Sequence, residues 1–218
     1  MTVLVAITGG SGSGKSTLAE ALLAALRPGA CALISEDWYY RDVPPGADPA
    51  HHDFDDVAAR DHALLIAHLA ALKAGQTISA PAYCFIRHAR LPGGPAVAPA
   101  EVVILEGAHL LCDPQLAALF DLRVYLDTPS DVRFIRRLLR DQSERGRSAD
   151  SVVSQYLATV RPAHERLIGP SRQHADIVLI DASPAVAAPD PAVIRRLAAP
   201  VLAHPVLQGF VGERGPQA

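Results

Sequence analysis

The chain has 218 residues, half of them apolar, and a formal net charge of −3. This length suits one domain with a packed core, and the weak charge gives no broad attraction to nucleic acid or a membrane surface. Three unevenly spaced cysteines (Cys31, Cys84 and Cys112) argue against a disulfide framework or a zinc site, and no apolar run is long enough to span a bilayer. We therefore expect a cytoplasmic protein that binds neither nucleic acid nor a membrane.

The first predicted elements are a buried strand, Val3–Thr8, a glycine-rich loop and a helix over Ser16–Leu26. The loop matches the phosphate-binding pattern G-x-x-x-x-G-K-[ST] in the strand–loop–helix context that the pattern requires. Its glycines let backbone N–H groups surround phosphate oxygens, Lys15 would reach the outer phosphates, and the Ser16 hydroxyl would bind magnesium. The predicted ATP-binding residues are Gly9, Gly10, Ser11, Gly12, Ser13, Gly14, Lys15, Ser16 and Thr17.

A second strand is predicted over Ala32–Ser35, and a segment rich in prolines and acids follows it, Tyr39–Arg60. A helical pattern of Leu and Ala then covers Asp61–Ala74 and stops at Gly75. The segment Ala80–Pro99 is rich in Pro and Gly, which predicts a loop or hairpin excursion. We expect both irregular segments to lie over the substrate side of the sheet.

An acid follows the next predicted strand, Val102–Glu106. A carboxylate at the end of a buried strand beside the phosphate loop is placed to bind magnesium, directly or through water, so Glu106 joins Ser16 as a predicted metal ligand. The alternative is a surface acid at a strand end. The chain contains no asparagine, which excludes the Asn-Lys-x-Asp loop of guanine-specific switches.

The helix predicted over Ser130–Glu144 carries several arginines and leads into a glycine. Five arginines fall within a dozen residues: Arg136, Arg137, Arg140, Arg145 and Arg147. A mobile segment of this kind can close over a nucleotide and neutralise the transferred phosphoryl group, so residues 140–150 are predicted to form a lid. The alternative is a solvated helix face on which Asp141 and Glu144 partner the arginines.

The remaining strands are predicted over Leu122–Asp127 and Ile177–Ile180. Between them lies a helix predicted over Asp150–Ile168, which Pro162 should kink. The tail is rich in Ala and Pro, and Asp190–Ala203 is expected to form one weak helix.

Strands that alternate with helices predict an α/β fold. Together with the phosphate loop they indicate a P-loop kinase fold, a doubly wound five-stranded parallel sheet with helices on both faces and ligands at the carboxyl ends of the strands. Residues 1–182 would form the P-loop kinase domain, with the excursion at 80–99 and the lid at 140–150. Residues 183–218 would form a partly flexible C-terminal helix and tail.

The chain resembles the uridine kinases (uridine–cytidine kinases) of the phosphoribulokinase and uridine kinase group, from the phosphate loop to about Ile180. The segments that carry the resemblance, in order and spacing, are Glu36-Asp37-Trp38-Tyr39-Tyr40, Asp53-Phe54-Asp55, Pro81-Ala82-Tyr83-Cys84-Phe85, His88-Ala89-Arg90, Leu105-Glu106-Gly107, Arg140 to Arg147, Gln155-Tyr156 and Ala175-Asp176-Ile177.

The resemblance implies a role for each matching residue. Asp37 would accept the proton of the 5′-hydroxyl and also lie in the magnesium shell, with Lys15 on the phosphates. Residues expected to serve the phosphates from the lid are Arg140, Arg145 and Arg147. Residues expected to bind the nucleoside are Tyr40, Phe54, Tyr83 and His88 around the pyrimidine, and Asp55, Arg137 and Gln155 at the ribose. Taken singly, each aromatic residue has core packing as its alternative, and His88 could be a surface histidine.

Three positions depart from the family pattern. Asp56-Val57 stand where the family has His-Pro, Cys84 replaces an Asp or Ser, and after Ile177 the family's Pro-Arg-Gly is absent, with Ile180-Asp181-Ala182 in its place. The first departure bears on the acceptor, and it leaves open whether Asp55 or Asp56 points inward. The last could alter the adenine side or the subunit contacts.

The resemblance thus implies ATP- and magnesium-dependent phosphorylation of the 5′-hydroxyl of uridine, with cytidine as a second substrate, by a homo-oligomer. One alternative is a kinase of the same group that acts on another hydroxyl acceptor, such as a sugar phosphate or a modified nucleoside. The other is a nucleotide-binding regulator without catalysis, against which the retention of Lys15, Ser16, Asp37 and Glu106 argues.

Overall fold

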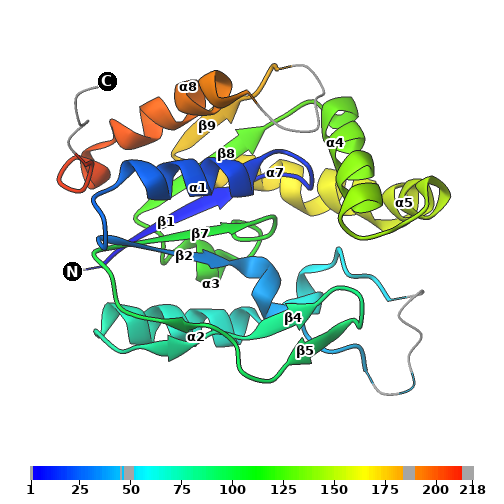
Figure 1. Ribbon diagram of the computed structural model, residues 1–218, viewed down its shortest axis with the longest axis horizontal. Coiled ribbons are helices and arrows are strands. Elements are labelled where there is room, and N and C mark those ends of the chain that lie inside the picture. The colour runs from blue at the N-terminus through cyan, green and yellow to red at the C-terminus, as the bar shows by residue number, and fades with distance from the viewer. Residues whose placement is uncertain (1, 45, 47–51, 184–189, 213–218) are drawn as a thin grey trace.

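The computed structural model describes residues 2–44, 46, 52–183 and 190–212. Its centre is a five-stranded parallel sheet in the order β2-β7-β1-β8-β9 (Figure 1). The strands are β1 (Val3–Thr8), β2 (Cys31–Ser35), β7 (Val102–Gly107), β8 (Leu122–Asp127) and β9 (Ile177–Ile180). All five predicted strands are confirmed, three with the predicted bounds and two one residue longer, because continuous apolar runs specify strands that are buried on both faces.

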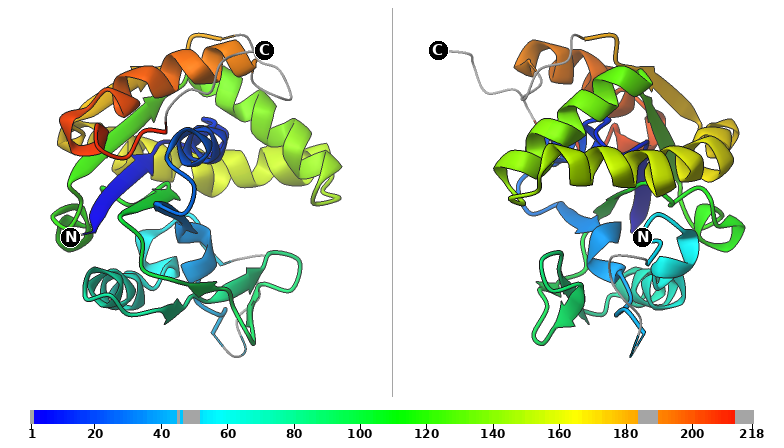
Figure 2. Two further views of the ribbon diagram at one scale, coloured as in Figure 1. Left: turned by 60° about the vertical axis from the view of Figure 1, so that its left-hand side comes forward. Right: turned by 90° about the vertical axis from the view of Figure 1, so that its right-hand side faces the viewer.

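Helices cover both faces of the sheet, as the two views of Figure 2 show. On one face α1 (Lys15–Ala25) packs beside α8 (Pro191–Leu202), and together with the sheet they form one apolar core. The core on the other face contains residues of α2 (His62–Lys73) and α3 (Pro114–Ala117). The doubly wound α/β fold is therefore confirmed.

Helix α8 is better packed than its sequence indicated. The Asp190 side chain caps it by accepting the Ala192 N–H at 2.7 Å, and Ile194, Leu197 and Val201 are buried in the core that α1 shares. Burial of a side chain of this size stabilises the fold by about 1.5–3 kcal/mol. The predicted helix is confirmed, but its supposed weakness is wrong for the described residues.

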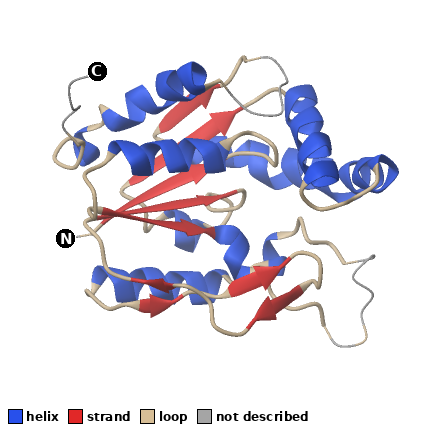
Figure 3. Ribbon diagram, in the orientation of Figure 1, coloured by secondary structure: helices blue, strands red, loops and turns tan. Residues whose placement is uncertain are grey.

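The substrate side of the sheet is built from the two irregular segments. After β2 the chain forms a 3₁₀ turn, η1 (Glu36–Tyr39), and a second one, η3 (Val57–Ala59), precedes α2. The predicted excursion at 80–99 is a β-hairpin followed by a further short strand, which pairs with a strand just before residue 80 (Figure 3). Its strands are β3 (Ile78–Ser79), β4 (Ala82–Cys84), β5 (Ala89–Leu91) and β6 (Ala96–Val97).

Opposite this hairpin lie α4 (Ser130–Ser143) and a long helical run that begins at Ala149 (Figure 1). The run consists of α5 (Ala149–Gln155), the π turn η4 (Tyr156–Val160), α6 (Arg161–Ala163), the π turn η5 (His164–Ile168), α7 (Gly169–Ser171) and the 3₁₀ turn η6 (Arg172–His174). Pro162 lies between the two π turns, and its neighbours keep helical dihedrals. The expected end of this helix at Ile168 is wrong, since the helical run continues to His174.

The last described element is the 3₁₀ turn η7 (Pro205–Leu207). Within the described ranges, no helix combines the length and the apolar character that crossing a bilayer requires. The predicted tail residues 184–189 and 213–218 lie outside the described residues.

Candidate active site

A cavity of about 880 Å³ lies at the carboxyl ends of the strands, between the substrate-side segments and the helices α4 and α5. All five predicted catalytic residues line it: Lys15, Asp37, Arg140, Arg145 and Arg147. The predicted substrate-binding residues line it as well: Tyr40, Phe54, Asp55, Tyr83, His88, Arg137 and Gln155. Of the other predicted nucleotide-binding residues Ser11 reaches the cavity, whereas Ser16 and Glu106 lie beside it, in contact with each other.

The phosphate loop has a conformation that its glycines make accessible. Gly12 and Gly14 have φ values of +80° and +93°, a left-handed region that other residues seldom adopt. A Cβ atom on Gly12 would lie 2.2 Å from the Arg133 carbonyl oxygen, so the loop also needs glycine for space. Helix α1 starts directly after Gly14 and has no acidic residue in its first turn, which leaves the positive potential of its N-terminus available to an anion.

Two side chains, Arg136 of α4 and Thr128 just before α4, hold this loop through the Ser13 carbonyl oxygen. The buried Arg136 donates to Asp181 at 2.8 Å and, at 3.5 Å, to the Ser13 carbonyl oxygen, and Thr128 also donates to that oxygen. Burial alone would raise the pKa of Asp181, but hydrogen bonds from Ser183 and Arg136 lower it. Arg136 therefore does not belong with the lid arginines as predicted. Asp181, one of the departures from the family pattern, supplies its buried partner.

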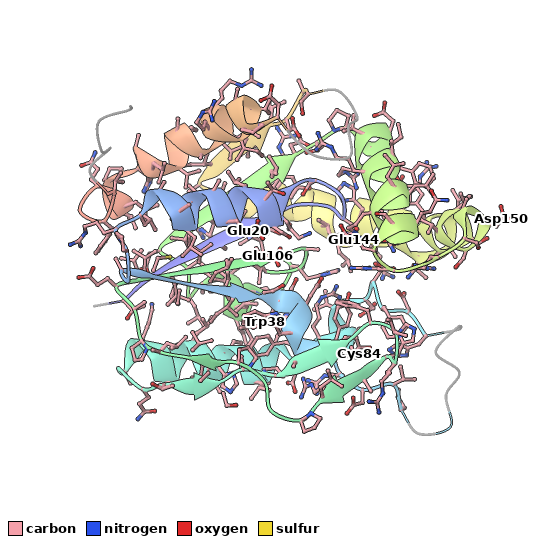
Figure 4. The ribbon with its side chains drawn as sticks, in the orientation of Figure 1. Glu20, Trp38, Cys84, Glu106, Glu144 and Asp150 are labelled. Atoms are coloured by element: carbon pink, nitrogen blue, oxygen red, sulfur yellow. The ribbon has the colours of Figure 1, made fainter. Side chains whose placement is uncertain are left out.

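The predicted metal ligands meet where β2 and β7 end. Glu106, labelled in Figure 4, accepts hydrogen bonds from Ser16 at 2.9 Å and from Ser35 at 2.5 Å. Burial, and the nearby charge of Asp37, raise the pKa of Glu106, against the opposing effect of Lys15. The Asp37 side chain is partly exposed to the cavity, and its backbone N–H points to the Ser35 hydroxyl at 3.3 Å.

These residues fit a magnesium ion. Magnesium prefers oxygen ligands and is usually held by one or two carboxylates together with substrate phosphates. Ser16 donates its proton to Glu106, which leaves the lone pairs of its oxygen free for a cation. Within the described residues no cluster of three or more His, Cys, Asp and Glu is arranged to hold a metal without a substrate. A cation would also compensate the buried charge of Glu106.

Aromatic side chains form one wall of the cavity. Tyr40 and Tyr83 lie 5.1 Å apart between ring centres, and Phe54 stacks on His88 at 4.8 Å with an interplanar angle of 24°. His88 has a φ of +50°, a strained backbone conformation of a kind that persists where the surrounding structure requires it. The Tyr83 hydroxyl is buried without a hydrogen-bond partner among the described residues. A flat ligand with polar edges would suit this wall.

Asp55 points into the cavity and Asp56 points away from it. Asp55 accepts the Thr159 hydroxyl proton at 2.7 Å, whereas Asp56 caps η3 and pairs with the exposed Arg166 at 3.2 Å. Thr159, which also lines the cavity, was not predicted. Its spacing of four from Gln155 would have placed it on the same helix face.

The lid arginines converge on a single buried acid, Asp141, which has no exposed surface. Its carboxylate oxygens lie 2.7 Å from Arg140 and 3.6 Å each from Arg137, Arg145 and Arg147. Burial opposes ionisation of Asp141, but the arginines, Arg140 foremost, lower its pKa. The alternative of a solvated helix face is wrong for the buried Asp141 and Arg137, but its pairing of Asp141 with the arginines is confirmed. Asp141 was not predicted as a site residue.

The same arginines also contact α5, the phosphate loop and the β4–β5 hairpin. Gln155 accepts from Arg137 at 2.9 Å and from Arg147 at 2.5 Å, and Arg137 donates to Ser11 of the phosphate loop at 2.9 Å. Arg145 stacks on Phe85 of the β4–β5 hairpin at 4.6 Å. The lid, the phosphate loop and the hairpin therefore enclose one space.

A layer of buried charge that the sequence did not reveal lies under the nucleoside side. Glu36 has no exposed surface and accepts from the His62 ring at 2.8 Å and from the His109 backbone N–H at 3.0 Å. Burial works against its ionisation, but the His62 hydrogen bond and the charge of Arg60 lower the pKa of Glu36 to about 2. Burial and Arg60 lower the pKa of His109 to about 3, so its Nε2–H donates to the Asp55 carbonyl oxygen as a neutral imidazole.

Comparison with known proteins places the chain in a family. The sequence profile of the Phosphoribulokinase / Uridine kinase family matches residues 4–187. A uridine kinase of Clostridium botulinum (strain Langeland / NCTC 10281 / Type F) is 44% identical over 179 residues, 81% of this chain and 87% of that protein. A uridine kinase of Chloroflexus aggregans (strain MD-66 / DSM 9485) is 40% identical over 178 residues, with 81% and 85% covered.

A solved structure assigned as a fructose transport system kinase, from Silicibacter sp. TM1040, superposes with a TM-score of 0.64 at 26% identity. The match covers 81% of this chain and 89% of that one. The chain belongs to the phosphoribulokinase and uridine kinase family.

Proposed function

We propose that the protein transfers the terminal phosphoryl group of ATP to the 5′-hydroxyl of uridine, and also of cytidine. The observation that carries the proposal is that one cavity is lined both by Lys15 with the lid arginines and by the aromatic wall with Asp55. We assign the phosphates to the first set of residues and the nucleoside to the second, and we call the part lined by the second set the nucleoside half. Asp37, two residues after the end of β2, lines the same cavity.

In this proposal Asp37 accepts the proton of the attacking 5′-hydroxyl. Charge on the transferred group is neutralised by Lys15 from the phosphate loop and by Arg140, Arg145 and Arg147 from the lid. Magnesium, held by Ser16, Asp37 and Glu106, would supply further positive charge on the phosphates. The enclosure of the site by the lid and the hairpin excludes water, which limits hydrolysis of ATP.

The nucleoside half would bind a pyrimidine riboside. In this proposal Tyr40, Phe54, Tyr83 and His88, which line the cavity, surround the base. The second carboxylate oxygen of Asp55 can accept hydrogen bonds from the ribose hydroxyls. Arg137 and Gln155, which are hydrogen-bonded to each other, would contact the same part of the nucleoside. A sugar phosphate has no flat ring for the aromatic wall to bind. A regulator without catalysis would not need a proton acceptor such as Asp37 in the cavity.

Several features are proposed from the family resemblance: ATP as donor, a cytoplasmic location, a homo-oligomeric assembly, and the division into a kinase domain of residues 1–182 and a C-terminal helix and tail. The uridine kinases that the chain matches at 40–44% identity support the choice of acceptor.

A substrate panel tests the proposal. ADP release would be measured with ATP and magnesium in the presence of uridine, cytidine, thymidine, adenosine, ribulose 5-phosphate and fructose. We expect uridine and cytidine to give the highest kcat/KM. Faster release with a sugar or sugar phosphate than with uridine would reject the proposed acceptor, and no acceptor-dependent release would favour the regulator.

A further inference from the structure

Arg60 is a buried arginine that lines the nucleoside half of the cavity. Its side chain is 4% exposed. A buried guanidinium is tolerated only where its donors find acceptors and its charge finds partners. Those partners come from two segments of the site, residues 36–40 and residues 54–56.

The guanidinium holds the segment that carries Asp55 and the aromatic wall together. Its Nη1 donates to the carbonyl oxygens of Phe54 at 3.1 Å and of Asp56 at 3.2 Å, one on each side of Asp55. Its Nη2 donates to the Tyr40 hydroxyl, and the guanidinium carbon lies 4.3 Å from the centre of the Tyr40 ring. A planar fork can make these bonds at once, whereas an ammonium group cannot.

The same charge lies beside two carboxylates. The Arg60 Nε is 3.7 Å from Glu36, and its Nη2 is 4.0 Å from Oδ1 of Asp37, the proposed base. Burial would lower the pKa of Arg60, but Tyr40, Glu36 and Asp37 outweigh it and keep the guanidinium charged. Glu36 has no exposed surface, so water screens its attraction to Arg60 little, whereas the Asp37 side chain is 44% exposed and its attraction is weaker.

Backbone hydrogen bonds next to Arg60 join the two ends of the loop between Arg41 and Ala59. The Arg41 N–H donates to the Ala59 carbonyl oxygen and the Asp61 N–H to the Tyr39 carbonyl oxygen, both at 2.8 Å. Tyr40 and Arg60 are thus paired in backbone as well as in side chain. These backbone bonds fix only the two ends of the loop. The hydrogen bonds from the Arg60 side chain to the carbonyl oxygens of Phe54 and Asp56 fix a point within it.

We propose that Arg60 is a positioning residue for the acceptor, which sets Asp37, Tyr40 and Asp55 in one arrangement that fits a nucleoside. The identity of the acceptor rests on the proposed function. Arg60 acts through these three residues and has no contact with the phosphate loop. An arginine that merely stabilised the fold would change the amount of folded enzyme, whereas a positioning residue changes the KM for the nucleoside and leaves the KM for ATP alone.

Kinetics of Arg60→Met and of a matched control, Arg41→Met, test the proposal. The Arg41 side chain is half exposed and pairs with Asp61 at the end of the same loop, outside the cavity. For Arg60→Met we expect kcat/KM for uridine to fall by about 10²-fold, mainly through KM, while the KM for ATP stays within about twofold. Arg41→Met should keep both KM values.

Arg60→Lys is the second variant, since it keeps the charge and loses the fork. It should recover part of kcat and retain a raised KM for uridine. An unchanged KM for uridine in both Arg60 variants, with kcat falling only in proportion to folded protein, would overturn the proposal. The same losses in Arg41→Met would overturn it as well. If Arg60→Met does not fold, Arg60→Lys decides by the same criterion.

Amide hydrogen exchange separates this proposal from the proposed function, because it needs no activity. Amides of residues 36–41 and 52–61 should exchange faster in Arg60→Met than in Arg41→Met. If they do, and the native protein does not phosphorylate uridine, the acceptor is wrong and the positioning role stands. Equal exchange in the two variants would reject the positioning role, whatever the acceptor.

Discussion

Asp55 and Asp56 are neighbours in the chain and differ completely in surroundings. Asp55 faces the cavity and receives one hydrogen bond from Thr159, and Asp56 faces outward to Arg166. A carboxylate in a closed site needs donors for its remaining lone pairs. The ribose hydroxyls could supply them to Asp55, but not to Asp56.

We therefore predict that 2′-deoxyuridine is a poor substrate, since it leaves part of this carboxylate without a donor. The loss should be about 1–3 kcal/mol, and towards the lower end because Thr159 still satisfies one oxygen. Asp55→Ala should shrink the ratio of kcat/KM between uridine and 2′-deoxyuridine, and Asp56→Ala, the matched control, should preserve it. A ratio that Asp55→Ala leaves untouched would refute the contact.

At the scale of elements, the arginine-rich end of α4 and the following segment form a preassembled anion site. Four arginines surround Asp141, whose single negative charge leaves the cluster strongly positive. Asp141 is thus an internal counter-charge that holds the arginines near one another until phosphates arrive. Figure 4 labels Glu144 and Asp150, which belong to this part of the chain.

Asp141→Asn should lower the free energy of unfolding of the ligand-free protein by roughly 1–3 kcal/mol, because buried arginines lose their counter-charge. Phosphates can replace that charge. The rise in melting temperature on adding ATP should therefore be larger in Asp141→Asn than in the native protein. Glu144→Gln, an exposed neighbour, should change neither quantity. An equal or smaller rise in Asp141→Asn would show that Asp141 does not hold the arginines for phosphate.

The elements differ in how well their sequence predicted them. The apolar runs of the sheet and the phosphate loop have local patterns, so their positions could be predicted within a residue. The π turns around Pro162 and the inward turn of Asp141 depend on packing against other segments, which periodicity does not contain. Clustering along the sequence grouped Arg136 with the lid arginines, but its partner Asp181 lies 45 residues away in the chain.

At the scale of the whole molecule, the resemblance to a family predicted many of the residues that line the cavity, but it missed Arg60, His109 and Thr159 and the charged layer to which the first two belong. That layer joins Glu36, Arg60, His62, His109 and Asp113 from three segments that are distant in sequence. Residues of these charged and polar types seldom lie fully buried, so none of them alone predicts a buried site. Only the fold makes them a buried network under the site.

This network makes stability depend on pH. Although burial opposes it, bonds to Glu36 and Asp113 raise the pKa of His62 above 6.5, its unfolded-state value, so its contribution is complete below pH 6.5 and is lost as the pH rises through the folded-state pKa. The pKa of Glu36 is lowered from 4.5 to about 2, so its contribution is present above pH 4.5 and is lost towards pH 2.

The difference in free energy of unfolding between the native protein and His62→Gln should therefore be largest between pH 4.5 and 6.5 and shrink at higher pH. Urea denaturation at a series of pH values measures it, with His174→Gln, an exposed histidine, as the control. A difference that stays constant up to pH 9, or grows, would show that His62 is neutral in the folded protein.

The most direct test of the central claim is the product formed from uridine and ATP. Mass spectrometry and phosphorus NMR would follow ADP and uridine 5′-monophosphate with the native protein and with Lys15→Ala, which removes only the point charge from the phosphate loop. We predict equal amounts of the two products from the native protein, and a loss of both in Lys15→Ala with unchanged melting. ADP without uridine 5′-monophosphate, or near-native turnover in a folded Lys15→Ala, would contradict the assignment.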